Sequence, residues 1–201
     1  VTGSAVDRLM YQVRAARSQK GTLEIRGGGS KAFYGEAPQG VPLDVTPLQG
    51  ISSYEPSELV VTARAGTPLA ELEEALAKKG QYLPFEPPRF GQGGTVGGMV
   101  ASGLSGPARA AVGSVRDHVL GATLLNGQGH VLSFGGQVMK NVAGYDVCRL
   151  LAGSMGILGV ICEVSIKVMP QPVATCTLRF EKDAASAIQQ LNEWAGKPLP
   201  I

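Results

Sequence analysis

The chain has 201 residues, of which 44% are apolar and 17% charged, and its formal net charge is +2. This length and composition suit one large or two small globular domains and exclude a disordered or fibrous chain. The small, scattered basic excess argues against nucleic-acid binding, and no apolar run approaches the roughly 18–20 residues that cross a bilayer. Glycine occupies 28 positions, about twice its average usage, which predicts many turns and close backbone approaches.

The cysteines and histidines offer no metal or redox site. Cys148, Cys162 and Cys176 lie far apart and match no zinc, redox or iron–sulfur spacing. We therefore interpret them as buried thiols of a cytosolic protein. With only His118 and His130 in the chain, no metal site is predicted.

The first 80 residues predict helices and short strands in alternation. In chain order these are a helix over 7–19, strands at 23–26 and 43–45, a buried strand over 59–65 and a helix that ends at Gly80. The first helix carries Leu9 and Val13 on its apolar stripe. The second is expected to begin with Thr67 as the N-cap and Pro68 at the first helical position.

Residues 81–117 show little periodicity, many prolines and glycines and few charges. A loop of this length inside a compact domain is normally functional. The elements expected after it are a β-hairpin over 119–134, a short helix over 143–151 and a strand over 159–169. The strand is the clearest element, because apolar side chains from Val160 to Val168 occupy one face and polar ones the other.

A new unit begins after Pro170 and Pro172. It contains a predicted strand at 175–180 and a predicted helix over 184–195. A lone strand and helix cannot close a core, so we interpret this unit as the start of a domain that the chain does not complete.

Three glycine clusters dominate the sequence: RGGGSK at 26–31, a long cluster at 91–106 and GSMGILG at 153–159. Backbone N–H groups in such loops can converge on a phosphate, although a single cluster is more often a turn. No Gly-Lys-Ser/Thr precedes a helix, which excludes a P-loop. The last cluster follows a helix and leads into a strand, which disfavours a Rossmann fingerprint, and a Gly-x-Ser-x-Gly elbow is absent.

The order of the motifs carries a family resemblance. RGGGSK after a strand, VTARAGTPLAELEEAL, LPFEPP, TVGGMVASGLSG, SVRDHVLGATLLNGQG and GYDVCRLLAGSMGILGVICEVSIKV occur in this order. Together they resemble the flavin-binding domain of the vanillyl-alcohol oxidase/p-cresol methylhydroxylase (PCMH) superfamily over residues 7–172. EPPRFG at 86–91 and KNVAGYD at 140–146 make the chain similar, more narrowly, to the FAD-binding subunits of bacterial glycolate oxidases, which stand near the D-lactate dehydrogenases.

This resemblance implies an α+β fold of PCMH type. Two subdomains would span residues 1–172, with a boundary near 85–95 and FAD extended between them, and a C-terminal cap domain would start at 173–201. The pyrophosphate would lie against the first glycine loop. The positions that match the family's FAD contacts are Gly27, Gly28, Gly29, Ser30, Lys31, Pro87, Thr95, Gly97, Gly98, Ser102, Ser114, Asp117, Gly156, Val160 and Ile161.

The resemblance also implies a function. The chain would be an FAD-binding, electron-transferring subunit of a glycolate (D-2-hydroxy acid) oxidase or dehydrogenase complex, with a larger flavoprotein subunit and an iron–sulfur subunit as partners. It would be cytoplasmic and would reach the inner membrane only through those partners. Some relatives attach flavin to a histidine in the first glycine loop, but Ser30 follows the glycines here, so non-covalent FAD is expected.

Catalytic residues are not identified, because relatives carry substrate and metal ligands in the cap domain, so activity of this chain alone is not expected. Two alternatives stay open: the flavin domain of a self-sufficient FAD-dependent D-lactate, hydroxyacid or alditol oxidoreductase, and a flavin-free structural subunit that keeps the fold. Four conspicuous residues receive structural interpretations. We expect His118 at the surface or a partner contact, Tyr145 and Asp146 at the start of a short helix, and Trp194 in a core or interface.

Overall fold

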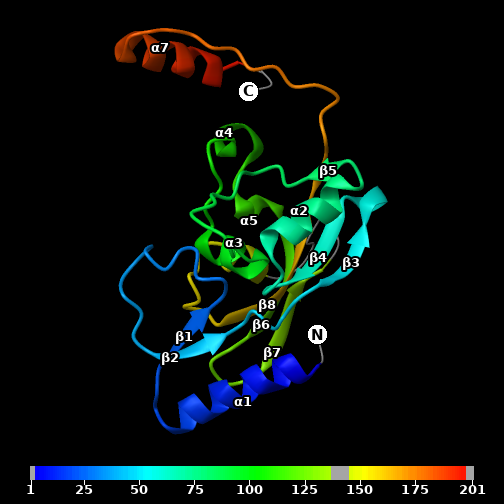
Figure 1. The fold of residues 1–201 in the computed structure, drawn as a ribbon, viewed down its shortest axis with the longest axis vertical. Coiled ribbons are helices and arrows are strands. Elements are labelled where there is room, and N and C mark those ends of the chain that lie inside the picture. The colour runs from blue at the N-terminus through cyan, green and yellow to red at the C-terminus, as the bar shows by residue number, and fades with distance from the viewer. Residues whose placement is uncertain (1–2, 137–144, 198–201) are drawn as a thin grey trace.

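The structure, a computed structural model, describes residues 3–136 and 145–197. Its centre is an antiparallel sheet of five strands in the order β3-β4-β8-β6-β7 (Figure 1). The strands are β3 Ile51–Glu55, β4 Val60–Arg64, β6 Val119–Leu125, β7 Val131–Gly135 and β8 Val160–Lys167. The sheet therefore joins strands from both sides of residues 85–95, and a subdomain boundary there stays a prediction.

A smaller unit lies at the lower end of the sheet in Figure 1. It consists of helix α1 (Ser4–Ser18) and two parallel strands, β1 (Leu23–Arg26) and β2 (Val41–Asp44). Its core combines side chains of α1 with those of β2, of the chain after it and of the ends of β6 and β8, namely Val6, Leu9, Val13, Leu43, Val45, Leu48, Leu125, Val160 and Cys162. The helix and both strands are confirmed, with α1 beginning three residues earlier than predicted.

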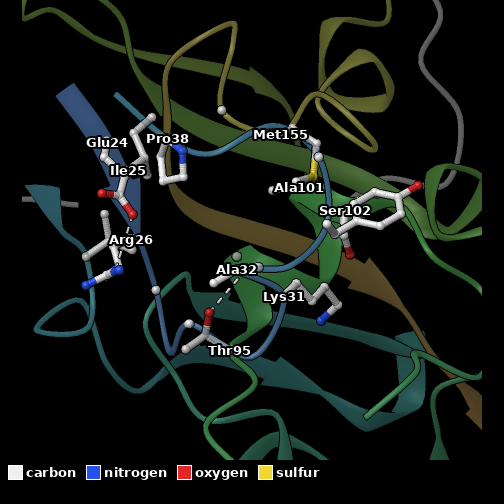
Figure 2. A pocket seen from close by; sticks show the side chains of 18 of the residues that line it. Glu24, Ile25, Arg26, Lys31, Ala32, Pro38, Thr95, Ala101, Ser102 and Met155 are labelled. Atoms are coloured by element: carbon white, nitrogen blue, oxygen red, sulfur yellow. Dashed lines mark hydrogen bonds and ion pairs between the residues drawn. The ribbon is translucent and has the colours of Figure 1, made fainter. Parts of the chain in front are cut away.

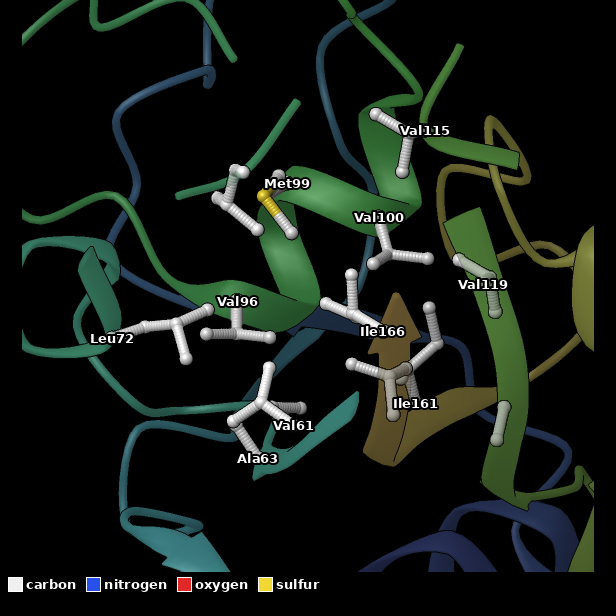
Figure 3. Close-up of a cluster of buried hydrophobic side chains, with 14 of the residues drawn as sticks. Val61, Ala63, Leu72, Val96, Met99, Val100, Val115, Val119, Ile161 and Ile166 are labelled. Atoms are coloured by element: carbon white, nitrogen blue, oxygen red, sulfur yellow. The ribbon is translucent and has the colours of Figure 1, made fainter. Parts of the chain in front are cut away.

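Two helices, α2 (Leu69–Ala77) and α3 (Val96–Ser102), pack on the sheet (Figure 3). Leu72 and Met99 are fully buried against strand residues such as Val61 and Ile166. A buried leucine is worth about 1.5–3 kcal/mol relative to an exposed one, so this larger core holds both helices in place. A short strand pair, β5 (Gln81–Tyr82) with β9 (Met169–Pro170), borders it.

Strand β8 serves both cores, which differs from the single apolar face that its sequence predicts. Its pairing with β6 skips Cys162, which forms a β-bulge. Val160 and Cys162 consequently pack in the α1 core, whereas Val164 and Ile166 pack under α2 and α3. The strand is confirmed, but the bulge exchanges its faces.

The segment 81–117 is not a structureless loop. It contains α3 and two single-turn helices, α4 (Arg109–Val112) and α5 (Val115–His118). Helix α3 begins at the N-cap Thr95 and ends at Gly103 with φ +63°. These helices span seven residues or fewer, too few for an apolar period to be recognised in the sequence.

Two side chains take other roles than predicted. Thr67 does not cap α2, which has Pro68 as its N-cap; its Oγ1 instead accepts a hydrogen bond from the Gly50 N–H at 2.9 Å. His118 is buried rather than at the surface, because α5 leads directly into β6. Its Nε2 lies 3.0 Å from the Val112 carbonyl oxygen, and burial lowers its pKa.

The prediction of buried thiols holds for two of the three cysteines. Cys148 and Cys162 are buried as predicted, and burial raises the pKa of each thiol to about 11. Cys176 is exposed, contrary to the prediction. It lies in an extended segment where no strand forms at 175–180, since no neighbouring strand of the described chain pairs with it.

Helices α6 (Val147–Leu150) and α7 (Ala184–Ala195) follow the prediction in part. Asp146 is the N-cap of α6, as expected, while Tyr145 is almost fully exposed and residues 140–144 of the KNVAGYD motif lie outside the described residues. Helix α7 has no buried residue and lies apart from the sheet in Figure 1. The ring centroids of Trp194 and Phe180 lie 5.4 Å apart, with the rings tilted by 58°. Within the described ranges, no helix has the length and apolar character needed to cross a membrane.

Candidate functional site: a cleft between three glycine segments

A cleft of about 560 Å³ opens between β1, α3 and the segment that precedes β8 (Figure 2). Its walls come from residues 23–39, 95–102 and 155–161, with Val45 and Ala65 between them. Each of the three glycine clusters thus contributes one wall. The volume lies within the range of small-molecule and cofactor sites, about 300–1,000 Å³.

Most of the predicted site residues line this cleft. They are Gly27, Gly28, Gly29, Ser30, Lys31, Thr95, Gly97, Gly98, Ser102, Gly156 and Ile161. Residues that lie as far apart in sequence as Gly27 and Ile161 therefore meet at one place. Their predicted contacts with FAD remain a proposal.

Four predicted site residues lie elsewhere. Ser114 and Asp117 form a capping box at α5, in which the Asp117 carboxylate accepts hydrogen bonds from the Ser114 N–H and hydroxyl at 2.8 and 2.9 Å. These hydrogen bonds lower the pKa of Asp117. Pro87 lines a separate cavity beside α2, and Val160 is buried in the α1 core.

The first glycine loop lies directly against the residues that precede α3. A Cβ added at Gly28 would overlap the carbonyl oxygen of Gly93, so only glycine allows the two backbones to approach this closely. Gly29 has φ +71°, in the left-handed region that favours glycine. In the described part of the chain, the backbone N–H groups of residues 28–31 donate no hydrogen bond, which leaves them available to an anion in the cleft.

The start of α3 forms the second wall. The Gly98 N–H donates to Thr95 Oγ1 at 3.2 Å, and the Gly97 N–H donates to the Ala65 carbonyl oxygen at 2.7 Å. Both amides are therefore already engaged within the protein. A Cβ at Gly98 would meet only Thr95 Oγ1, at 3.2 Å, so this glycine contributes an unobstructed surface to the cleft.

The third wall is the turn before β8. The Met155 N–H donates to the Ala101 carbonyl oxygen at 2.9 Å, which fastens this turn to α3. Met155 has φ +49°, an unusual backbone conformation for a residue with a side chain. A Cβ at Gly156 would lie 3.1 Å from Ile25 Cδ1, so the turn also packs against β1.

Four charged residues line the cleft in the described part of the chain: Glu24, Arg26, Lys31 and Glu36. Lys31 has no ion-pair partner within the described ranges, and partial burial lowers its pKa. Arg26 Nε lies 3.3 Å from Glu24 Oε1. Among the described residues, no group of three or more His, Cys, Asp or Glu side chains could hold a metal ion.

Several residues of the cleft were not predicted from the sequence. Arg26 and Met155 stand inside two of the recognised glycine clusters, so their motifs could have indicated them. Tyr34 and Pro38 belong to a segment without a periodic pattern. They reach the cleft only because this segment returns beside β1 before β2 begins.

A cleft of this volume, walled by three glycine segments in a mixed α and β fold, is typical of a cofactor-binding domain. The pattern of the family described as "FAD binding domain" matches residues 3–135, and the chain belongs to this family. The predicted α+β fold of PCMH type is thereby confirmed.

The relatives include glycolate oxidase subunits and D-lactate dehydrogenases. Glycolate oxidase subunit GlcE of Escherichia coli is 53% identical over 96% of this chain and 55% of its own length. The mitochondrial D-lactate dehydrogenase [cytochrome] of Arabidopsis thaliana is 33% identical over 79% of this chain and 29% of its own. Glycolate oxidase subunit GlcD of Bacillus subtilis is 30% identical over 87% of this chain and 38% of its own. The chain thus spans about half the length, or less, of these relatives.

The contact between the first glycine loop and Gly93 gives a prediction about stability. Gly28→Ala should lower the free energy of unfolding by about 2 kcal/mol or more, because the added methyl group must separate two backbones. Gly29→Ala is the control: its Cβ meets open space and should cost only about 1 kcal/mol for the left-handed backbone. Urea unfolding without added flavin measures both variants, and equal losses would contradict the close contact.

Proposed function

We propose that this cleft binds FAD non-covalently and that the chain is an FAD-binding, electron-transferring part of a complex that oxidises glycolate or a related D-2-hydroxy acid. The observation that carries the proposal is the convergence of the three glycine segments on one cleft in a chain of the FAD-binding domain family. The substrate class follows from the names of the relatives, two of which are glycolate oxidase subunits.

The residues of the cleft fit this cofactor. The unengaged N–H groups of residues 28–31 and the Lys31 ammonium would hold the pyrophosphate, since both favour an anion. The bare surface at Gly98 and the apolar side chains of Ala101 and Met155 would lie against the flavin. FAD itself would supply the capacity to accept two electrons from the substrate and to pass them on.

Non-covalent attachment rests on the side chains that face the cleft. No histidine or cysteine lines it in the described part of the chain, and the position after the glycines is Ser30. The flavin would then be held by hydrogen bonds, charge and packing alone.

The subunit assignment rests on what the cleft lacks. Oxidation of a 2-hydroxy acid requires a base near the hydroxyl group and a cation or metal that holds the carboxylate. Within the described ranges the cleft has two cations, of which Arg26 is paired with Glu24, and no group that could hold a metal ion. Partner subunits, a larger flavoprotein and an iron–sulfur protein, would complete the site in the cytoplasm or at the inner membrane, and residues 173–201 would begin a further domain.

The relatives named D-lactate dehydrogenase support a second candidate. In that case the full-length protein would be a self-sufficient flavin enzyme. The two candidates differ in whether the protein reacts with substrate alone.

FAD binding is tested with the full-length protein and Gly98→Val. The wild type should bind FAD and quench its fluorescence, whereas Gly98→Val should bind it at least tenfold more weakly, because a branched side chain would occupy the cleft. Gly91→Val is the control, since a Cβ at Gly91 meets nothing within 4 Å and Gly91 does not line the cleft. A wild type that neither binds FAD nor gains thermal stability from it would contradict the proposal.

Acid precipitation tests the mode of attachment. All flavin should remain in the supernatant, because hydrogen bonds and packing are lost when the chain unfolds. A yellow pellet would contradict non-covalent binding. Tyr34→Phe would then show whether the Tyr34 hydroxyl in the cleft is the point of attachment.

Stopped-flow mixing tests the subunit assignment. The FAD-loaded full-length protein should keep its flavin absorbance when mixed with glycolate or D-lactate, because the cleft provides no base paired with a carboxylate clamp. The partner subunits should restore the reaction. Rapid bleaching by either acid without partners would favour the self-sufficient enzyme.

A further inference from the structure

The two ends of the cleft differ in polarity. Glu24, Ile25 and Pro38 gather at one end, and Lys31 and Ser102 lie at the other (Figure 2). The acids that line the cleft are Glu24 and Glu36, and Glu24 lies at the first end. A cleft that takes an anionic cofactor thus has a carboxylate at one end, and this carboxylate would repel a phosphate there.

Glu24 is held inside the cleft wall rather than in solvent. Only 18% of its side chain is exposed, and its Oε1 lies 3.3 Å from Arg26 Nε. In the described part of the chain no hydrogen bond reaches its other oxygen, Oε2. An ionised carboxylate only accepts hydrogen bonds and repels phosphate, so the partner that suits Oε2 is a neutral donor such as a sugar hydroxyl.

The order of groups along β1 supports this partner. Glu24 and Arg26 are two residues apart in one strand and point to the same side, about 6–7 Å apart along it. The unengaged amides of residues 28–31 follow immediately. The Glu24 carboxylate and the Arg26 guanidinium are therefore followed along the cleft by the glycine loop. A nucleotide presents its ribose and then its phosphates in the same order. In dinucleotide sites of another fold, an acidic side chain likewise meets the ribose hydroxyls beside a glycine loop.

We infer that Glu24, positioned by Arg26, accepts hydrogen bonds from the adenosine ribose of FAD. This assignment rests on the proposed function and extends it, because it fixes the direction of the cofactor. The adenosine lies beside Glu24 and Pro38, the pyrophosphate lies against residues 28–31, and the isoalloxazine lies toward Ala101 and Ser102. Glu24 then selects FAD over FMN, because FMN lacks the adenosine and therefore its ribose.

The test compares two flavins on two proteins. FAD and FMN affinities are measured by fluorescence quenching with the full-length wild type and with Glu24→Gln, which keeps the shape and removes the charge. Glu24→Gln should weaken FAD about tenfold and leave FMN within twofold. Glu71→Gln, an exposed acid on α2 outside the cleft, is the control and should change neither affinity.

An FAD analogue without the adenosine ribose 2′-hydroxyl completes a double-mutant cycle between Glu24 and this hydroxyl group. The wild type should bind this analogue more weakly than FAD, and Glu24→Gln should bind the two alike. Equal weakening of FAD and FMN would mean that Glu24 acts only through Arg26 on the phosphate and would overturn the assignment, as would unchanged FAD affinity. A wild type that binds no FAD would overturn the proposed function as well.

Discussion

The close approach of glycine backbones to neighbouring segments is the constraint on which this structure depends. Gly28 lies against Gly93, and Gly97 lies so close to Ala65 that an added Cβ would be 2.6 Å from the Ala65 Cβ. The first contact joins the α1–β1–β2 unit to the segment before α3, and the second joins α3 to the end of β4. The cleft is the space that these contacts leave between the two units. A larger residue at either position would separate the walls as well as destabilise the fold.

The bulge in β8 places the third wall. Because pairing with β6 skips Cys162, the strand presents Val160 to the α1 core and Val164 to the core under α2 and α3. The turn of Met155 and Gly156, five residues or fewer before this strand, therefore lies where the two cores adjoin. The same strand that ties the cores together thus also positions the wall of the cleft that faces β1.

The parts of the fold that could be predicted from the sequence are those with an apolar pattern over many residues or with a family motif. Helix α1, the hairpin and strand β8 have apolar patterns long enough to recognise, and the glycine clusters indicated most of the cleft. Helices α4 and α5 could not be predicted, since one turn shows no period. The bulge at Cys162 depends on pairing with a strand distant in sequence, and Tyr34 reaches the cleft through a segment without a pattern, so neither leaves a local signal.

The positions of the acids explain why this scaffold suits binding better than acid–base chemistry. Asp117 and Asp146 cap helices, Glu73 is paired with Arg89, and Glu24 is paired with Arg26. Hydrogen bonds lower the pKa of both aspartates, which keeps them ionised and makes them weak bases at neutral pH. A general base needs a pKa near the working pH and a place beside the reacting hydroxyl. Besides Glu24 and Glu36, the described cleft offers backbone donors and cations, which can bind and orient an anionic cofactor.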